Sequence, residues 1–309
     1  MNIQGCDCSI VIKTTHREMD VPYSEETLRE AVSLLMEEAG IEGDGVCRAI
    51  RKNCGFSGCV VTPLTIETAP LLLYLAFGSA GLPVYVSETR NIYKYGLNLV
   101  PKEDTGRFDL IQDRGGQRRL FVGCEVKGFE LRFDHEDAIK LKLDISGEFP
   151  PEFYPYADIT QYQASGGEPR PFRVSAEDTK MPDTAIGRER FNSEFVTYKI
   201  NNQEVKNIYG VTLTTKKESG TKTEIWIKRI LDDETDLPEI IDELSITGRL
   251  LRDKYEYRYF GMFRITLKRL VLVSDETNVN SSDAVIGPLR YYVARTVTAE
   301  TFSSSEEAI

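Results

Sequence analysis

Residues 134–137, with the sequence Asp-His-Glu-Asp, place one of the chain's two histidines among three carboxylates. Such a group could bind a metal ion or act as a general acid. The same residue types are also favoured at the tip of a β-hairpin, and this interpretation puts His135 in a charged turn. The other histidine, His16, is expected on the surface at a strand end. Neither stands beside a serine or cysteine nucleophile motif, so the sequence predicts no catalytic role for them.

The remaining polar motifs lack the spacing of known chemical sites. Residues 55–59, Gly-Phe-Ser-Gly-Cys, do not have the GxSxG spacing of a nucleophile elbow, and no Walker A or GxGxxG pattern occurs. Acidic residues 232–236 lack the glycine-containing pattern of a calcium loop, which favours a solvated face. No CxxC pair occurs, so free thiols are expected for Cys6, Cys8, Cys47, Cys54, Cys59 and Cys124. The sequence therefore predicts that the protein is not an enzyme and has no metal or cofactor.

The composition is that of an ordinary globular protein with an acidic balance. The chain has 309 residues, 41% of them hydrophobic and 28% charged, with a net charge of −11 and a pI near 5.0. This charge argues against a sequence-independent hold on nucleic acid, which requires Lys and Arg to neutralise phosphates. The longest apolar run, near residues 69–77, is too short to span a membrane. No secretory signal is expected from the N-terminal sequence, and no membrane partner is predicted.

Residues 121–147 contain the strongest structural pattern in the chain. Two runs of alternating apolar and polar residues flank the 134–137 turn, which predicts a half-buried antiparallel hairpin. The phase of the first run slips by one at Gly128, where we expect a β-bulge. The candidate core residues of this hairpin, expected to build a barrel wall, are Phe129, Leu131, Phe133, Ile139, Leu141 and Leu143.

Local patterns predict the other elements. Residues 25–39 show apolar residues at helical spacing after the cap residue Ser24, and predict an amphipathic helix. A short buried helix is expected from Ala69 to a C-cap near Gly78. Trp226, between two isoleucines of a strand, is expected to face away from them, towards an interface or the helix. Strands are expected over residues 5–17, 46–52, 58–64, 196–200, 205–214, 223–230, 244–251, 255–273 and 289–298, with turns at residues 53–55 and at Asn201-Asn202.

Residues 148–190 differ in kind from the rest of the chain. They hold six of its thirteen prolines and show no periodicity, yet they are too rich in aromatic residues for plain disorder. We expect an inserted arm that becomes ordered against a neighbouring subunit. Its candidate ring or stacking contacts are Tyr154, Tyr156, Tyr162 and Phe172. Residues 1–147 and 191–302 are expected to form one β domain together, followed by a flexible tail at 303–309.

Three segments carry a family resemblance. The first, SGCVVTPLTIETAPLLLYLAFGS at residues 57–79, reads as a strand and a short apolar helix ending in a Gly-Ser turn. The second, FVGCEVKGFELRFDHEDAIKLKLDISGE at residues 121–148, is the alternating hairpin. The third, FVTYKINNQEVKNIYGVTLTTKKESG at residues 195–220, is followed by ITGRL and the closing strand FRITLKRLVLV. In this order the segments resemble the major tail tube protein of long-tailed bacteriophages.

The resemblance implies a mainly β fold with α (α+β): two packed antiparallel sheets that form a β-sandwich or barrel, flanked by a helix, with a long extended loop. It also implies hexameric rings that stack into a hollow tube, in the virion tail after assembly in the host cytoplasm. The implied partners are further copies of the chain, a tape-measure protein, the tail terminator and baseplate or distal tail proteins. Genomic DNA would be a transient passenger in the lumen. Ring closure would also remove exposed sheet edges.

Two other classes remain open from the residues alone. One is a β-sandwich binding module of a baseplate or adhesion type, with a carbohydrate or protein ligand. The tyrosines between residues 85 and 95 are the candidates for its binding surface. The other is a hydrolase, which would require a convergent pair of acidic side chains.

Overall fold

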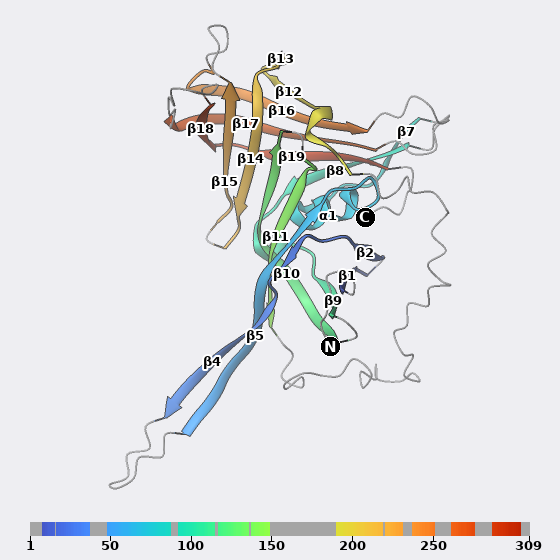
Figure 1. Ribbon diagram of the computed structural model, residues 1–309, viewed down its shortest axis with the longest axis vertical. Coiled ribbons are helices and arrows are strands. Elements are labelled where there is room, and N and C mark those ends of the chain that lie inside the picture. The colour runs from blue at the N-terminus through green and yellow to red at the C-terminus, as the bar shows by residue number, and fades with distance from the viewer. Residues whose placement is uncertain are drawn as a thin grey trace. The chain divides into compact units, whose positions relative to one another are not determined.

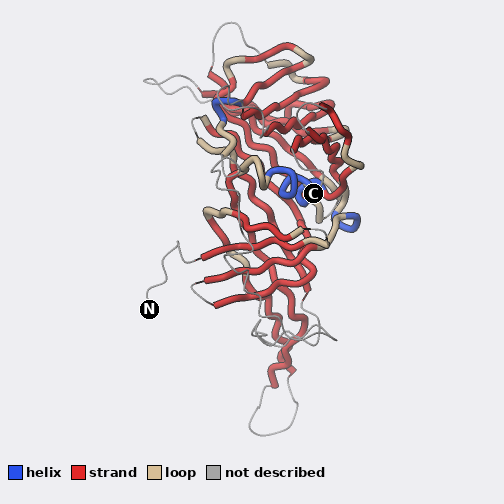
Figure 2. Tube along the Cα trace, turned by 90° about the vertical axis from the view of Figure 1, so that its right-hand side faces the viewer, coloured by secondary structure: helices blue, strands red, loops and turns tan. Residues whose placement is uncertain are grey.

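The computed structural model describes residues 8–15, 17–37, 48–87, 92–114, 117–135, 137–148, 190–218, 220–230, 237–250, 261–275 and 286–303 (Figure 1). Strands predominate in this part of the chain, and α1 (Ala69–Phe77) is its one α-helix (Figure 2). The predicted mainly β fold with a large antiparallel sheet and a helix is therefore confirmed. Closure into a barrel stays a prediction. The chain divides into two compact units.

Unit 1 comprises Met1–Val60, Arg107–Glu125 and Asp144–Lys180. Its antiparallel sheet has the order β2–β1–β9–β10. A second pair, β4 and β5, forms a long hairpin ladder (Figure 1). The strands with residues in this unit are β1 (Cys8–Lys13), β2 (Glu18–Val21), β3 (Glu25–Glu26), β4 (Arg29–Glu37), β5 (Arg48–Pro63), β9 (Phe108–Arg114), β10 (Gln117–Asp134) and β11 (Lys140–Glu148).

The helix predicted at residues 25–39 is wrong, because β3 and β4 occupy this part of the chain. β4 pairs with β5 from Arg29 opposite Ser57 to Glu37 opposite Arg48, with a register shift between Val32 and Ser33. A one-residue shift changes the phase of a period-two pattern, so apolar residues spaced four and then three apart fit a bulged strand as well as a helix. Long-range pairing with β5 outweighs the local helical propensity.

The turn predicted at residues 53–55 is also wrong, since β5 runs through it without interruption. Gly55 serves a close approach instead: a Cβ atom there would lie 2.9 Å from the backbone oxygen of Gly147. Gly147 is constrained in the same way, because its Cβ would lie 2.3 Å from Cζ of Phe56. The Phe56 ring packs on Phe121 at a centroid distance of 5.0 Å in the core of this unit.

The irregularity in β10 lies at Gly123 rather than at Gly128. Gly123 has a φ of +67°, and the register with β9 shifts between Phe121 and Cys124. The amide of Gly123 donates to Oδ1 of Asp109 at 2.9 Å, which holds the distorted backbone in place. Gly128 is the first residue of β10 that pairs with β14, and this pairing continues to Asp134 without a register shift.

Unit 2 comprises Val61–Gly106, Val126–Leu143 and Met181–Ile309. One run of paired strands has the order β10–β14–β15–β18–β17, and another has the order β17–β19–β8, with β6 and β7 on the far edge of β8. β16 pairs along β17, and β12 and β13 follow it. The further strands are β6 (Gly78–Ala80), β7 (Val84–Ser87), β8 (Ile92–Leu99), β12 (Val196–Ile200), β13 (Gln203–Val205), β14 (Ile208–Lys216), β15 (Lys222–Ile230), β16 (Ile240–Leu250), β17 (Gly261–Asp275), β18 (Ile286–Val293) and β19 (Val297–Ser303).

β17 is the strand shared by both runs, and it changes neighbour at Arg269. Residues before the change pair with β19, and residues after it pair with β18. Arg269 has a φ of +56°, in the left-handed region. The amide of Lys268 donates to the Thr296 carbonyl at 2.9 Å, and the amide of Ala294 donates to the Arg269 carbonyl at 2.8 Å. The single last strand predicted at residues 289–298 is therefore two strands, which separate at this point.

The hairpin formed by β10 and β11 supplies much of the core of unit 2. All six predicted core residues are fully buried: Phe129, Leu131, Phe133, Ile139, Leu141 and Leu143. The Phe263 ring of β17 packs against Phe133 at 6.2 Å and edge-on against Phe191 at 5.1 Å. The predicted turn also forms, because the amide of Asp137 donates to the Asp134 carbonyl at 3.2 Å.

Helix α1 forms where the sequence predicts it. It is buried almost all round, and its Phe77 ring stacks on Phe129 at 5.4 Å. Before its first turn, Thr65 and Thr68 each accept a hydrogen bond from the other's amide through the hydroxyl oxygen. Gly78 ends the helix with a φ of +98°, and a Cβ atom there would lie 2.6 Å from Cγ2 of Thr105. Only glycine fits this end without strain.

Leu141→Glu is expected to lower the free energy of unfolding by at least about 3 kcal/mol, because it removes buried apolar surface and places a charge in the core. Lys142→Glu, on the opposite face of β11, is expected to change it by less than about 1 kcal/mol. Chemical denaturation followed by circular dichroism compares the two variants. An equal loss in both would contradict the assignment of the two faces.

Arg269→Gly is expected to leave the free energy of unfolding unchanged or raise it by up to about 1 kcal/mol, because glycine adopts positive φ without strain. Arg269→Val is expected to lower it by more than about 1 kcal/mol, since a β-branched residue is disfavoured there. The neighbouring exposed Lys268 has no positive φ and is the matched control. There the order should reverse, with Val tolerated and Gly destabilising. Thermal melts of the four variants check this, and the same order at both positions would contradict it.

Candidate functional site

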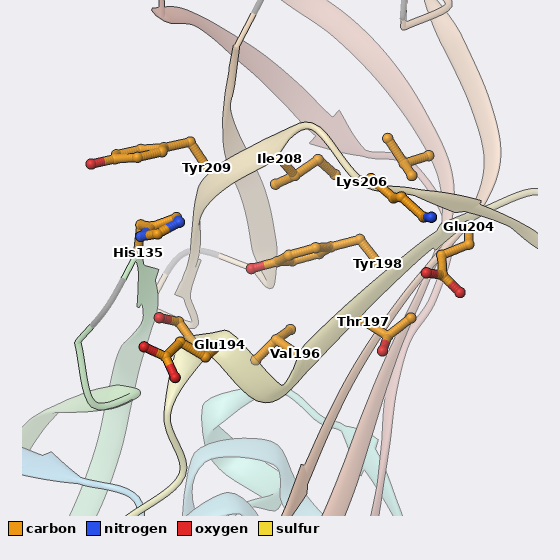
Figure 3. A pocket seen from close by; sticks show the side chains of 11 residues that line it. His135, Glu194, Val196, Thr197, Tyr198, Glu204, Lys206, Ile208 and Tyr209 are labelled. Carbon is orange, nitrogen blue, oxygen red and sulfur yellow. The ribbon is translucent and has the colours of Figure 1, made fainter.

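An open depression of 280 Å³ lies on unit 2 and is a candidate for a binding site (Figure 3). Four segments form it: the tip after β10, the 3₁₀ turn η4 (Ser193–Phe195), the β12–β13 hairpin and the start of β14. Its lining consists of His135, Ser193, Glu194, Val196, Thr197, Tyr198, Glu204, Val205, Lys206, Ile208 and Tyr209.

The turn Asn201-Asn202 positions the floor of the depression. Both asparagines have positive φ, +48° and +68°, as a two-residue hairpin turn with right-handed strand twist requires. The sequence predicted a turn here, and the structure confirms it. The turn places Tyr198 opposite Val205, with the Tyr198 ring in the middle of the depression (Figure 3).

Two rings stack beside this floor. The His135 and Tyr209 rings lie 4.8 Å apart and within 15° of parallel. The register between β14 and β15 shifts between Ile208 and Gly210, so Tyr209 is the extra residue of a bulge. A bulge re-aims its side chain, and here it brings Tyr209 over the hairpin tip.

Tyr198 is the buried polar group of the site. The residue is only 7% exposed, and its ring lines the depression. Burial raises the pKa of this phenol well above its usual range, and the nearby charge of Asp134 raises it further. The phenol therefore keeps its proton at neutral pH and offers both a donor and an acceptor.

Charged side chains surround the rings. Glu194, in η4, is positioned by Asn192, whose side-chain oxygen accepts from the Glu194 amide at 3.4 Å. Glu204 and Lys206 lie together at the other end of the depression (Figure 3). No group of three metal-ligating side chains occurs within the described ranges.

The structure describes some of the residues that the sequence singled out, whereas others lie outside the described ranges. His135 lies at the hairpin tip and lines the depression, and Lys140 lowers the pKa of the neighbouring Asp137 through a 2.6 Å side-chain hydrogen bond. Cys59 and Cys124 are free thiols. Tyr154, Tyr156, Tyr162, Phe172 and the acidic residues 232–236 lie outside the described residues, and their predicted roles stay predictions.

Sequence reasoning missed Glu194, Tyr198 and Tyr209 as site residues. One signal was available, because Tyr198 alternates with the polar residues Thr197 and Lys199 and so had to face inwards. The bulge that turns Tyr209 outwards has no comparable signal.

Trp226 faces away from the buried Ile225 and Ile227, as the sequence predicts. The Arg290 guanidinium lies over its ring, 5.4 Å from the centroid. Arg290 also forms a two-pronged ion pair with Glu224, with Nη2 of Arg290 2.7 Å from Oε2 of Glu224. This cluster links the solvent faces of β15 and β18.

Lys217 is a buried lysine at the C-terminal end of α1. It is 1% exposed, and its ammonium donates to the Phe77 carbonyl at 3.3 Å. Burial lowers the pKa of Lys217 to about 8. The negative end of the helix dipole is the charge complement of this ammonium.

No protein-family model and no curated protein matches this sequence. No helix within the described ranges is both long and apolar enough to cross a membrane.

Lys217→Met is expected to remove a pH dependence of stability. The cost of burying the ammonium is fully present below about pH 8, and it falls as the pH rises from there towards the ordinary lysine value of 10.5. The stability of the wild type relative to Lys217→Met should therefore increase between pH 7.5 and 9.5 by roughly 1 to 3 kcal/mol. Urea unfolding at both pH values measures this, and other titrating groups cancel because both proteins share them. A constant difference would show that Lys217 is not buried as a charge.

Proposed function

We propose that this chain is a structural protein whose copies assemble head to tail into a hollow tube of the kind found in the tails of long-tailed bacteriophages. The observation that carries the proposal is a pair of exposed apolar surfaces on unit 2, each on a different set of strands. The mainly β fold and the three sequence segments that resemble the tail tube family support it.

The first surface, the sheet patch, crosses β16, β17 and β18. Ile240 lies opposite Val271, and Val271 lies opposite Tyr292, so the three side chains form one row across the sheet. They are 49%, 37% and 38% exposed, and the nearby Val273 is 55% exposed. A contiguous apolar row on a solvent face is typical of an interaction surface.

The second surface, the β7 patch, lies on and just before the edge strand β7. Its residues are Leu82, Val84, Tyr85 and Val86, and Leu82 is 88% exposed. Figure 1 shows β7 and β18 on opposite sides of unit 2. Two different patches on opposite sides suit a heterologous contact, in which the sheet patch of one copy meets the β7 patch of the next. Such contacts generate closed rings or growing filaments.

A tube protein of this class would also give the acidic balance of the chain a role. The acidic balance, with a net charge of −11, would repel DNA phosphates from the wall and keep a passing duplex mobile. The partners that follow are a tape-measure protein inside the tube and terminator and baseplate or distal tail proteins at its ends. Residues 154–172, with Tyr154, Tyr156, Tyr162 and Phe172, are proposed as further contacts between subunits.

Val271→Asp, in the sheet patch, and Val84→Asp, in the β7 patch, are each expected to abolish assembly beyond the monomer. A buried carboxylate without a partner is costly in an interface. Sedimentation velocity and negative-stain electron microscopy of the concentrated protein measure this, with Lys222→Asp on exposed β15 as the control that should assemble normally. Circular dichroism confirms that each variant is folded.

Mixing the two variants tests the head-to-tail contact more specifically. Each keeps one intact surface, so a head-to-tail contact allows a dimer between them but no further growth. Assembly of either variant like wild type, or wild-type protein that stays monomeric at high concentration with or without its tape-measure partner, would overturn the proposal.

The second candidate is a β-sandwich binding module of a baseplate or adhesion protein, and the ring-lined depression favours it. A monomeric wild-type protein that binds a carbohydrate or protein ligand at Tyr198 would support this class instead.

A further inference from the structure

The tip of the β14–β15 hairpin in unit 2 gathers lysines that assembly through the two apolar patches does not use (Figure 1). Lys216, the last residue of β14, lies directly opposite Lys222, the first residue of β15. On its other edge Lys216 pairs with Gly128 of β10, the residue that follows Lys127. The Lys127 carbonyl accepts a hydrogen bond from the Lys217 amide at 2.8 Å. Three strands therefore bring four lysines together at one end of the sheet.

The one carboxylate at this tip is already engaged. Nζ of Lys127 lies 2.8 Å from Oε1 of Glu218, and its hydrogen bond and charge lower the pKa of that carboxyl. The charges of Lys102 and Lys216 act on the same carboxyl in the same direction. Glu218 is thus shared among three ammonium groups, and positive charge remains in excess at the tip.

The carboxylates in the adjoining row of the sheet are bound to arginines. Glu224 forms an ion pair with Arg290 at 2.7 Å, and Glu130 forms one with Arg132. The two lysines that face each other across β14 and β15 are exposed and form no ion pair within the ranges that the structure describes. Like charges directly opposite each other, with Cβ atoms about 5 Å apart, destabilise a sheet. An anion held between the two ammonium groups would remove this repulsion.

A hydroxyl beside the facing lysines also lacks a partner. Oγ1 of Thr221, the residue before Lys222, is buried and has no hydrogen bond within the described part of the chain. The residue as a whole is half-buried, so it lies close to solvent. Buried polar atoms normally meet a protein group, a ligand or water. An anion at the tip would accept the hydrogen bond that this hydroxyl can donate.

We propose that the β14–β15 tip binds the phosphate group of a small molecule between Lys216 and Lys222, with the Thr221 hydroxyl as a third donor. A phosphate monoester carries about two negative charges and three acceptor oxygens, which match two ammonium groups and one hydroxyl. A carboxylate would neutralise only one of the two lysines. A small phosphate compound is favoured over nucleic acid, because the net charge of −11 repels a long polyanion. The proposal does not depend on the sheet patch or the β7 patch.

Isothermal titration calorimetry of the full chain with pyrophosphate is the direct test. Saturable binding that weakens as salt is added is expected. Acetate at the same ionic strength should give no saturable heat, and a short DNA duplex at the same phosphate concentration should bind at least about tenfold more weakly. Absence of saturable pyrophosphate binding, or equal binding of acetate, would overturn the proposal. A duplex that binds more tightly than pyrophosphate would also overturn it and would identify a nucleic-acid surface instead.

Four variants locate the binding. Lys216→Gln and Lys222→Gln should each weaken pyrophosphate binding by about fivefold or more, because each removes one ammonium group. Thr221→Val keeps the shape of the side chain without its hydroxyl and should weaken binding by about twofold or more. Lys199→Gln makes the same charge change on exposed β12 of the same unit and should leave binding unchanged. Circular dichroism verifies each fold. Equal weakening by Lys199→Gln would show that binding follows net charge, which would contradict a site at the tip.

Lys222→Asp separates this proposal from the proposed assembly. The residue lies outside both apolar patches, so the variant should assemble normally, whereas its carboxylate should abolish saturable pyrophosphate binding. A variant that assembles and still binds pyrophosphate like the wild type would overturn the phosphate site and leave the tube proposal standing. Failure of the wild type to assemble would contradict the tube proposal alone, because the calorimetric measurement needs only the folded monomer.

Discussion

The fold of unit 2 depends on one strand that must serve two sets of neighbours. β17 pairs with β19 over its first part and with β18 over its second, while β16 follows it on the other side. One edge of a strand can pair with only one neighbour at a time. β18 and β19 must therefore separate at the point where β17 changes its partner. Arg269, at positive φ, is that point, and its carbonyl and the Lys268 amide hold the diverging chain. Strain at one residue is offset by the pairing of both runs of strands.

The sequence predicted best where neighbours along the chain determine the structure. The alternation of apolar and polar residues predicted both faces of the β10–β11 hairpin. Asn201-Asn202 predicted a turn, since asparagine tolerates positive φ, and the apolar run before Gly78 predicted α1. The predictions were wrong where pairing with a strand distant in the sequence determines the structure. The spacing in residues 25–39 fits a helix or a bulged strand, and only pairing with β5 selects the strand. The separation of β18 from β19 is likewise set by β17, not by residues 289–298 themselves.

The candidate site was less predictable for the same reason. Its residues come from four segments between His135 and Tyr209, and each has an ordinary local role as a turn, cap or strand residue. The bulge at Tyr209 appears only in the register between β14 and β15. His135, at the predicted hairpin tip, lines the depression, whereas the other lining residues come from η4, the β12–β13 hairpin and the start of β14.

The bend at Arg269 also links the fold to the proposed assembly. Directly after it, Leu270 is fully buried and Val271 is exposed, so the second half of β17 presents a new face to solvent. The register with β18 then shifts between Leu272 and Ser274, which leaves Val273 more exposed still. A strand continuing in its first register would meet β19, and Val271 would have no Tyr292 opposite it. The apolar row across β16, β17 and β18 therefore follows from the change of neighbour that also divides the strands into two runs.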